Sequence, residues 1–135
     1  MRFMLFVKGN EETEGGVMPD EEMLATMGKY NEELAKAGVL LDLAGLQPTS
    51  NGARIEYSGK KRTIVDGPFT EAKEVVAGYW LLETKTKDEA IEWAKRVPFD
   101  EGAVELRQLF ELEDFEPGPA VDRARELGKQ LGIVK

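Results

Sequence analysis

Apolar and polar residues alternate along several short stretches of the chain, which is typical of β-strands. Residues 2–7 place Phe3, Leu5 and Val7 on one face of a strand, and the other face is also mostly apolar. Such a strand is expected at the centre of a sheet that is covered on both sides. Similar short runs predict five further strands, at residues 39–46, 54–58, 61–65, 75–83 and 103–112.

Two stretches between these strands repeat apolar residues every three or four positions, which indicates helices. The first begins after Pro19 with acidic residues that suit a helix N-terminus, and Gly38 ends it. The second follows Thr86, which forms a predicted capping box with Glu89, and it stops at Pro98. A third helix is predicted at residues 120–131. Residues 9–18 are rich in Gly and Glu without periodicity, which predicts a flexible loop and a candidate lid.

The order of these elements predicts an α+β domain of ferredoxin-like topology, with an antiparallel sheet and two helices on one face, followed by a C-terminal helix. The second face of the sheet would then be uncovered. By strand alternation it carries Met4, Phe6 and Leu109, which form too apolar a surface to leave in water. A second copy packed sheet to sheet would cover it, so we expect a homodimer.

The charge of the chain narrows its expected partners. A net charge of −8 and a pI near 4.7 argue against binding to nucleic acid, and Lys60, Lys61 and Arg62 are interpreted as a solvated hairpin turn. No apolar run approaches the ~18 residues that would span a membrane. The apolar part of residues 1–8 is too short for a signal peptide, so we expect a cytoplasmic protein.

The chain contains neither Cys nor His. This excludes disulfides, thiol nucleophiles, zinc sites of the Cys/His type and an imidazole general base. Acid–base chemistry would have to come from Asp, Glu, Lys or Tyr. A carboxylate site for Mg²⁺ or Ca²⁺ stays open, although no EF-hand-like spacing supports one. We therefore expect no metal site and no cofactor.

The connection between residues 65 and 75 is much longer than the two to five residues or so of a simple hairpin turn. It opens with Asp66, Gly67, Pro68 and Phe69. Asp66 either shapes the loop as an Asx-turn or acts as a general base that the rigid Gly67–Pro68 pair holds in position. Phe69 is interpreted as a hydrophobic plug more readily than as a residue that stacks on a substrate.

Several charged and phenolic residues could join Asp66 in one site. By alternation Arg2, Glu105 and Arg107 lie on the uncovered sheet face, where they form either an ion-pair network between subunits or a pocket for an anionic ligand. Lys73 could change the pKa of nearby carboxyl groups if the loop is buried. Tyr79, like Tyr30, is either a core residue or part of the pocket lining. The sequence therefore predicts Arg107, Lys73, Glu105, Tyr79 and Arg2 as substrate-binding candidates around Asp66.

Four stretches of the chain resemble the YCII-related superfamily, specifically its DGPF branch. They are VDGPFTEAKEVVAGYWLLE, KDEAIEWAKRVP, GAVELRQLFE and YNEELAKAGVLLDLAGLQPT. The resemblance covers about residues 1–115 and leaves residues 116–135 as a helical tail outside the domain. It implies a dimeric α+β barrel of ferredoxin-like type. The positions that match are Asp66, Gly67, Pro68, Phe69, Lys73, Gly78, Glu105 and Arg107.

What the resemblance implies about function is general. Some relatives are linked to lyase or dehydrochlorinase chemistry through a His–Asp pair, of which this chain retains only a counterpart to the Asp, at Asp66. The expectation is a small-molecule pocket at the sheet and dimer interface, with cofactor-free lyase or isomerase chemistry using Asp66 as acid and base. The alternative is a non-catalytic ligand-binding or regulatory dimer, because some relatives are associated with transcription control through sigma factors.

Overall fold

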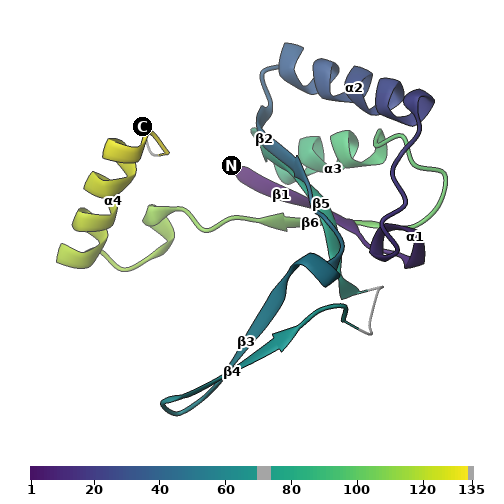
Figure 1. The fold of residues 1–135 in the computed structure, drawn as a ribbon. Helices are drawn as coiled ribbons and strands as arrows, with labels where there is room; N and C mark the ends of the chain where they lie inside the picture. The colour runs from purple at the N-terminus through teal and green to yellow at the C-terminus, as the bar shows by residue number, and fades with distance from the viewer. Residues whose placement is uncertain (70–73, 134–135) are drawn as a thin grey trace.

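The computed structural model describes residues 1–69 and 74–133, and a four-stranded antiparallel sheet forms its centre (Figure 1). The sheet has the strand order β2-β5-β1-β6. Its strands are β1 (Arg2–Lys8), β2 (Leu40–Gly45), β5 (Val76–Glu83) and β6 (Val104–Gln108). With a long helix between β1 and β2 and another between β5 and β6, this order gives the ferredoxin-like α+β topology predicted from the sequence.

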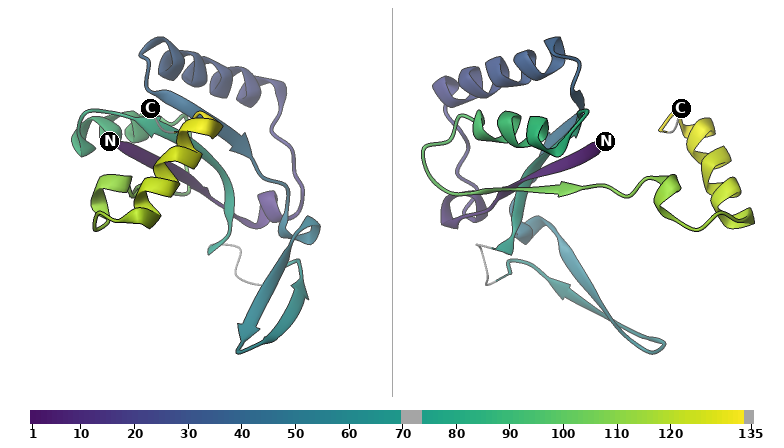
Figure 2. Two further views of the ribbon diagram at one scale, coloured as in Figure 1. Left: turned by 90° about the vertical axis from the view of Figure 1, so that its left-hand side faces the viewer. Right: turned by 180° about the vertical axis from the view of Figure 1, so that it is seen from behind.

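Helices α2 (Glu21–Lys36) and α3 (Lys87–Lys95) lie side by side on one face of this sheet (Figures 1 and 2). The core between sheet and helices is a cluster of buried side chains: Leu5, Tyr30, Leu34, Val39, Trp80 and Leu82. Alternation along β1 and β5 sends Leu5, Trp80 and Leu82 towards the helices. The apolar pattern of the sequence therefore located these six core residues correctly.

Tyr30 is a core residue, which settles one of the two alternatives left by the sequence. Its ring meets that of Trp80 edge to face, with 5.4 Å between centroids. The hydroxyl group donates a hydrogen bond of 2.8 Å to the carbonyl of Trp93, so helix α2 is tied to α3 through this side chain. Burial raises the pKa of Tyr30 to about 12, so the hydroxyl group stays protonated, and a hydrogen-bond donor, well into the alkaline range.

The opposite side of the sheet, here called the open face, consists of Met4, Phe6, Tyr79, Leu81, Glu105 and Arg107. The strand register places Met4 between Leu81 and Arg107, and Phe6 between Tyr79 and Glu105. Because residues opposite each other in neighbouring strands point to the same side, these six side chains share one face. This face lies away from α2 and α3 (Figure 2). The expected placement of Glu105 and Arg107 on it is confirmed.

Two arms extend from the body of the domain (Figures 1 and 2). One is the hairpin of β3 (Ala53–Ser58) and β4 (Lys61–Asp66), which forms a separate two-stranded sheet. The other is the C-terminal arm, residues 109–133, which contains the 3-10 turn η3 (Leu112–Asp114) and helix α4 (Pro119–Leu131). The predicted hairpin and terminal helix are both present.

The strand predicted at residues 103–112 is shorter than expected. It ends at Gln108, and Phe110 is 76% exposed although the alternating pattern assigns it to the core. The physical reason lies in β1, which begins at Arg2. The N–H of Leu109 donates to the Arg2 carbonyl at 2.9 Å, and the neighbouring strand provides no ladder partner beyond that point.

The interpretation of residues 9–18 as a flexible loop is wrong at residues 11–14, which form helix α1 (Glu11–Glu14). A capping box stabilises this single turn: the Asn10 side chain accepts from the N–H of Thr13, and the Thr13 hydroxyl accepts from the N–H of Asn10. One helical turn is too short to produce an apolar repeat, so the periodicity gave no signal for it.

Arg2 links the sheet to the C-terminal arm, and its predicted role in substrate binding stays a prediction. Its guanidinium group donates two hydrogen bonds to the Glu111 carboxylate, at 2.8 and 2.9 Å. These hydrogen bonds lower the pKa of Glu111 below its ordinary value of 4.5. The ion pair therefore links the first strand of the sheet to the base of the arm.

We expect Glu111→Gln to lower the free energy of unfolding by about 0.5–1 kcal/mol at pH 7, since both partners are partly exposed. A carboxyl group with a lowered pKa in the folded state stabilises the fold above its unfolded-state pKa and loses that effect as the pH falls through its folded-state pKa. The difference from wild type should therefore shrink as the pH falls below the ordinary pKa of Glu, and it should be lost once the pH is below the lowered pKa of Glu111 in the folded state. Urea unfolding at pH 7 and pH 3 measures it, with Glu32→Gln on the exposed surface of α2 as control. Equal stability at pH 7 would contradict the prediction.

Helices that could cross a bilayer, by length and apolar content, are not found within residues 1–69 and 74–133.

Candidate functional site

The connection that opens with Asp66 joins the hairpin to β5 of the main sheet. The sequence alone left open why it is so long; the structure shows that it crosses from one sheet to another. Its first part lies against η1 (Thr49–Asn51), the turn that follows β2. The N–H of Gly67 donates to the Gly52 carbonyl at 3.2 Å. A side-chain carbon on Gly67 would lie 1.7 Å from the Thr49 carbonyl oxygen, so only glycine fits here.

The side chain of Thr49 connects this loop to helix α1. Its hydroxyl group donates to the Glu14 carboxylate and accepts a hydrogen bond of 3.0 Å from the N–H of Phe69. Glu14 also accepts from the N–H of Thr49 at 3.0 Å. Three segments that are distant in sequence therefore meet at one hydroxyl group. Sequence reasoning missed Glu14 and Thr49, because nothing in their local pattern indicates a long-range contact.

Phe69 is partly buried, and the guanidinium carbon of Arg54 lies 3.8 Å from the centre of its ring. A cation over an aromatic face is attracted by the ring's quadrupole. The contact joins the base of the hairpin to the loop. It agrees with the interpretation of Phe69 as a residue that packs. The Gly67–Pro68 peptide bond beside it is cis.

Asp66 is the last residue of β4 and is exposed to solvent. It ends a strand, as predicted, but that strand belongs to the hairpin and not to the four-stranded sheet. Asp66 pairs with Ala53, two positions from the pair of Ile55 and Ile64, so these four side chains share one face of the hairpin. The carboxylate is thus placed on an arm whose base is fixed by the contacts of Gly67 and Phe69. Lys73 lies outside the described residues.

The polar groups of the open face form two pairs. The Glu105 carboxylate lies 3.7 Å from the Arg107 guanidinium group, and both side chains are largely exposed, at 49% and 71%. Tyr79 donates a hydrogen bond of 3.0 Å from its hydroxyl group to the Asp42 carboxylate, and this bond raises the pKa of Tyr79. Tyr79 therefore lies on the open face and not in the core. Its predicted place in the lining of a pocket stays a prediction. Asp42 was not identified from the sequence.

The described part of the chain includes at least two cavities. One, of about 270 Å³, lies within the C-terminal arm beside Arg2; the other, of about 180 Å³, lies between the end of α3 and the start of β6. Neither is lined by Asp66 or Arg107. Within residues 1–69 and 74–133, no cluster of three or more acidic side chains could hold a metal ion.

Fold and surface together define a small α+β domain of ferredoxin-like topology with one charged, partly apolar sheet face exposed. The chain belongs to the YCII-related domain family, whose sequence model matches residues 1–113. The family assignment made from the sequence is confirmed, while the resemblance to the DGPF branch stays a prediction.

Two individual proteins are similar to this chain. An uncharacterised protein of Rhizobium meliloti (strain 1021) is 27% identical over 99 residues, which cover 73% of this chain and 80% of that protein. The solved structure of 5-chloro-2-hydroxyhydroquinone dehydrochlorinase from Burkholderia phenoliruptrix AC1100, in complex with 2,5-dihydroxybenzoquinone, is 13% identical and covers 86% of this chain and 100% of the other. The TM-score of 0.48 marks a distant likeness.

Proposed function

We propose that the chain acts as a homodimer that binds a small anionic molecule between the open face of its sheet and the second subunit. The observation that carries this proposal is the open face itself. Four apolar or aromatic side chains form its centre, at Met4, Phe6, Tyr79 and Leu81, and Arg107 stands at its edge. An apolar surface with a few convergent polar groups is typical of a ligand site once a second wall encloses it.

The exposed surface of the chain supports a second subunit. The chain exposes 10110 Å². A compact monomer of the same mass, 15.1 kDa, would expose about 7,100 Å². The surplus of about 3,000 Å² per chain is large enough to supply an extensive homodimer interface, which buries roughly 1,000–2,500 Å² from each partner.

Arg107 is the residue of the open face best suited to an anion. It is 71% exposed in the single chain, and its distance of 3.7 Å from Glu105 is longer than a hydrogen bond. A planar guanidinium group can donate two parallel hydrogen bonds to a carboxylate or phosphate. A ligand anion could therefore replace Glu105 as the partner of Arg107 without breaking a buried ion pair.

Thermal unfolding with anionic probes tests this proposal. We expect one or more of inorganic phosphate, succinate and benzoate to stabilise the protein. At about ten times its Kd, a ligand contributes about 1.4 kcal/mol and raises Tm by several degrees. Arg107→Gln should remove the shift, whereas Arg123→Gln on the exposed surface of α4 should keep it. An equal shift in wild type and Arg107→Gln, or no shift with any probe, would show that the open face is not an anion site.

A catalytic role for Asp66 is a second candidate, favoured by the way its position is fixed. The carboxylate is exposed at the end of a strand whose base is held by Gly67, Thr49 and Phe69. Such a group could take a proton from a carbon acid and return it elsewhere, as lyases and isomerases of the cofactor-free kind require. The alternative, a regulatory dimer that binds its ligand without reaction, uses the same open face.

Deuterium incorporation separates the two candidates. A compound that stabilises the protein would be incubated with it in D₂O and followed by proton NMR. Catalysis predicts exchange or conversion that Asp66→Asn slows by about 10²–10⁴-fold while binding is retained. Glu56→Gln, on the other face of the hairpin, is the matched control. Binding without any exchange in the wild-type protein would favour the regulatory dimer.

A further inference from the structure

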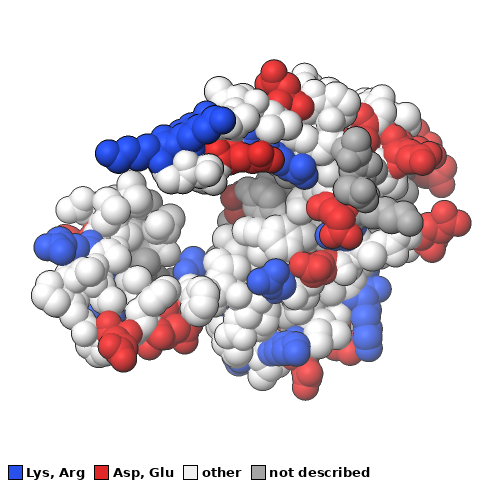
Figure 3. All heavy atoms as spheres, turned by 90° about the horizontal axis from the view of Figure 1, so that it is seen from below, with Lys and Arg blue, Asp and Glu red and all other residues white. Residues whose placement is uncertain are grey.

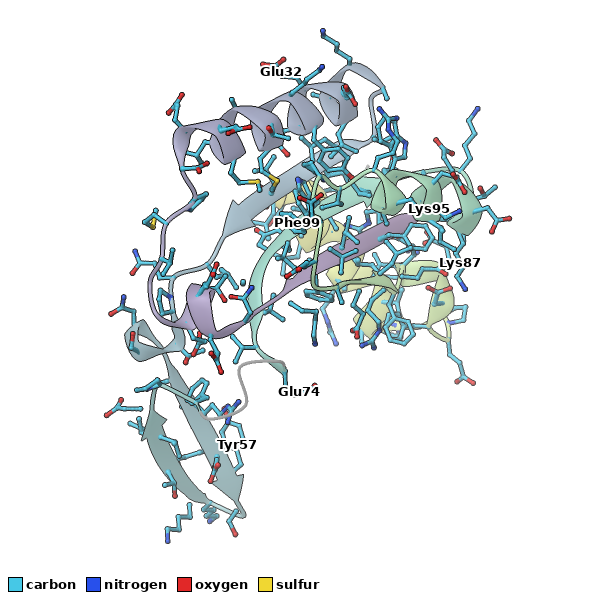
Figure 4. The ribbon with its side chains drawn as sticks, turned by 90° about the vertical axis from the view of Figure 1, so that its right-hand side faces the viewer. Glu32, Tyr57, Glu74, Lys87, Lys95 and Phe99 are labelled. Carbon is cyan, nitrogen blue, oxygen red and sulfur yellow. The ribbon has the colours of Figure 1, made fainter. Side chains whose placement is uncertain are left out.

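The hairpin presents an apolar face that its own chain leaves exposed. Ile55 pairs with Ile64, and Tyr57 with Arg62, so these four side chains lie on one side of the two strands. Ile64 is 69% exposed, and Tyr57, which is labelled on the hairpin in Figure 4, is 71% exposed. Arg62 lies over the Tyr57 ring, with 4.6 Å to its centre. A two-stranded hairpin is only marginally stable in water by itself, so a surface that covers this face would stabilise it.

The C-terminal arm also has an exposed apolar side. Phe110 and Phe115 pack against each other with 5.3 Å between ring centroids, and they line the 270 Å³ cavity beside helix α4. The helix adds Leu127 and Leu131 to the lining, and Leu131 is 63% exposed. A helix of 13 residues depends on packing of its apolar face for stability. Within its own chain, α4 packs mainly on η3.

The two arms carry opposite charges at the positions where they could meet. The hairpin tip has three successive basic residues, Lys60, Lys61 and Arg62, in a chain with a net charge of −8 (Figure 3). The first part of the C-terminal arm has exposed carboxylates at Glu113 and Glu116. In a single chain the arms stand apart on different sides of the body (Figures 1 and 2).

We propose that the hairpin of one subunit packs against the C-terminal arm of a second copy of this chain. The proposal rests on the homodimer proposed above and adds its contacts. The apolar face around Ile64 would cover the cavity lined by Phe110 and Leu131, and the basic tip would lie beside Glu113 and Glu116. Two-fold symmetry forms this contact twice. The surplus exposed surface of the chain is large enough for both contacts and the sheet interface.

This arrangement has a consequence for Asp66. Its side chain shares the hairpin face of Ile64 and Ile55, which is the face that the partner's arm would cover. The solvent-exposed carboxylate at the base of the hairpin would then lie at the rim of a contact between subunits. The second subunit would then supply a wall beside Asp66, a residue that lines neither the cavity of the C-terminal arm nor the one between α3 and β6.

Charge reversal on each arm tests the proposal. The variants are Lys60→Glu/Lys61→Glu on the hairpin and Glu113→Lys/Glu116→Lys on the arm, all at exposed positions. Each variant alone would place like charges at both contacts, so we expect a dimer weaker by roughly ten- to a hundredfold in sedimentation equilibrium at low salt. At 1 M salt, where the Debye length is about 3 Å, much of this loss should disappear. Circular dichroism verifies that each variant folds. If a double variant does not fold, the single substitutions Lys60→Glu on the hairpin and Glu116→Lys on the arm replace the two double variants.

Mixing the two variants distinguishes contacts between subunits from contacts within one chain. A heterodimer of the hairpin variant with the arm variant has opposite charges at both contacts, so the mixture should dimerise about as tightly as wild type. Variants that dimerise with wild-type affinity would overturn the proposal and leave the homodimer standing. A mixture that stays weak, with rescue only when all four changes are in one chain, would also overturn it. A monomeric wild-type protein at micromolar concentration would overturn both the dimer and the arm contact.

Discussion

Replacing Gly67 by alanine is expected to lower the free energy of unfolding by about 3 kcal/mol or more. The added carbon would lie 1.7 Å from the carbonyl oxygen of Thr49 and 2.4 Å from its carbon. Both are backbone atoms, so no side-chain rotation can relieve the overlap. The loop must move away from η1, which breaks the hydrogen bond from Gly67 to Gly52 and disturbs the contact of Phe69 with Thr49.

Urea denaturation of the full chain measures this effect, with Gly45→Ala as the matched control. Gly45 has open space at the position of the added carbon, so that change should be almost neutral. If the Gly67 variant also loses the anion-induced thermal shift, the loop and the ligand site are coupled. Equal stability of the two alanine variants would mean that the loop does not lie against η1 as the structure has it.

Replacing Phe6 by aspartate is expected to weaken the proposed homodimer at least a thousandfold, or about 4 kcal/mol. Phe6 lies at the centre of the open face, between Tyr79 and Glu105. A carboxylate at this position would be removed from water on association without a partner, and Glu105 beside it would add repulsion. Because the interface is two-fold symmetric, the change occurs twice in one dimer.

Sedimentation velocity from nanomolar to micromolar concentration would show the change as a shift from dimer to monomer. Leu24→Asp is the control, since Leu24 is 53% exposed on α2, on the other side of the sheet. That variant should dimerise as wild type does. A Phe6 variant that remains dimeric would place the interface elsewhere, and the arm contact could then be tested separately through its own charge reversals.

The residues of the candidate site differ in how far the sequence could locate them. Alternation along β6 placed Glu105 and Arg107 on the open face, because side chains of a strand point to its two faces in turn. The same reasoning could not identify the partner of Arg2, because Glu111 lies in a segment beyond the last strand. Glu14 and Thr49 were missed for a similar reason, since their hydrogen bonds join segments 35 residues apart.

Local patterns determined the elements of this protein, and tertiary contacts determined how its site is assembled. The periods of apolar residues fixed the strands, the two packed helices and the core that includes Tyr30 and Trp80, because burial of apolar surface follows directly from the sequence pattern. The sequence alone did not show that Asp66 belongs to a separate hairpin, that Thr49 fixes its base or that both arms stand exposed. Those features depend on which distant segments meet in space. They are decided by single contacts, such as the hydroxyl group of Thr49 or the lack of a strand partner, and such contacts leave no periodic signal along the chain.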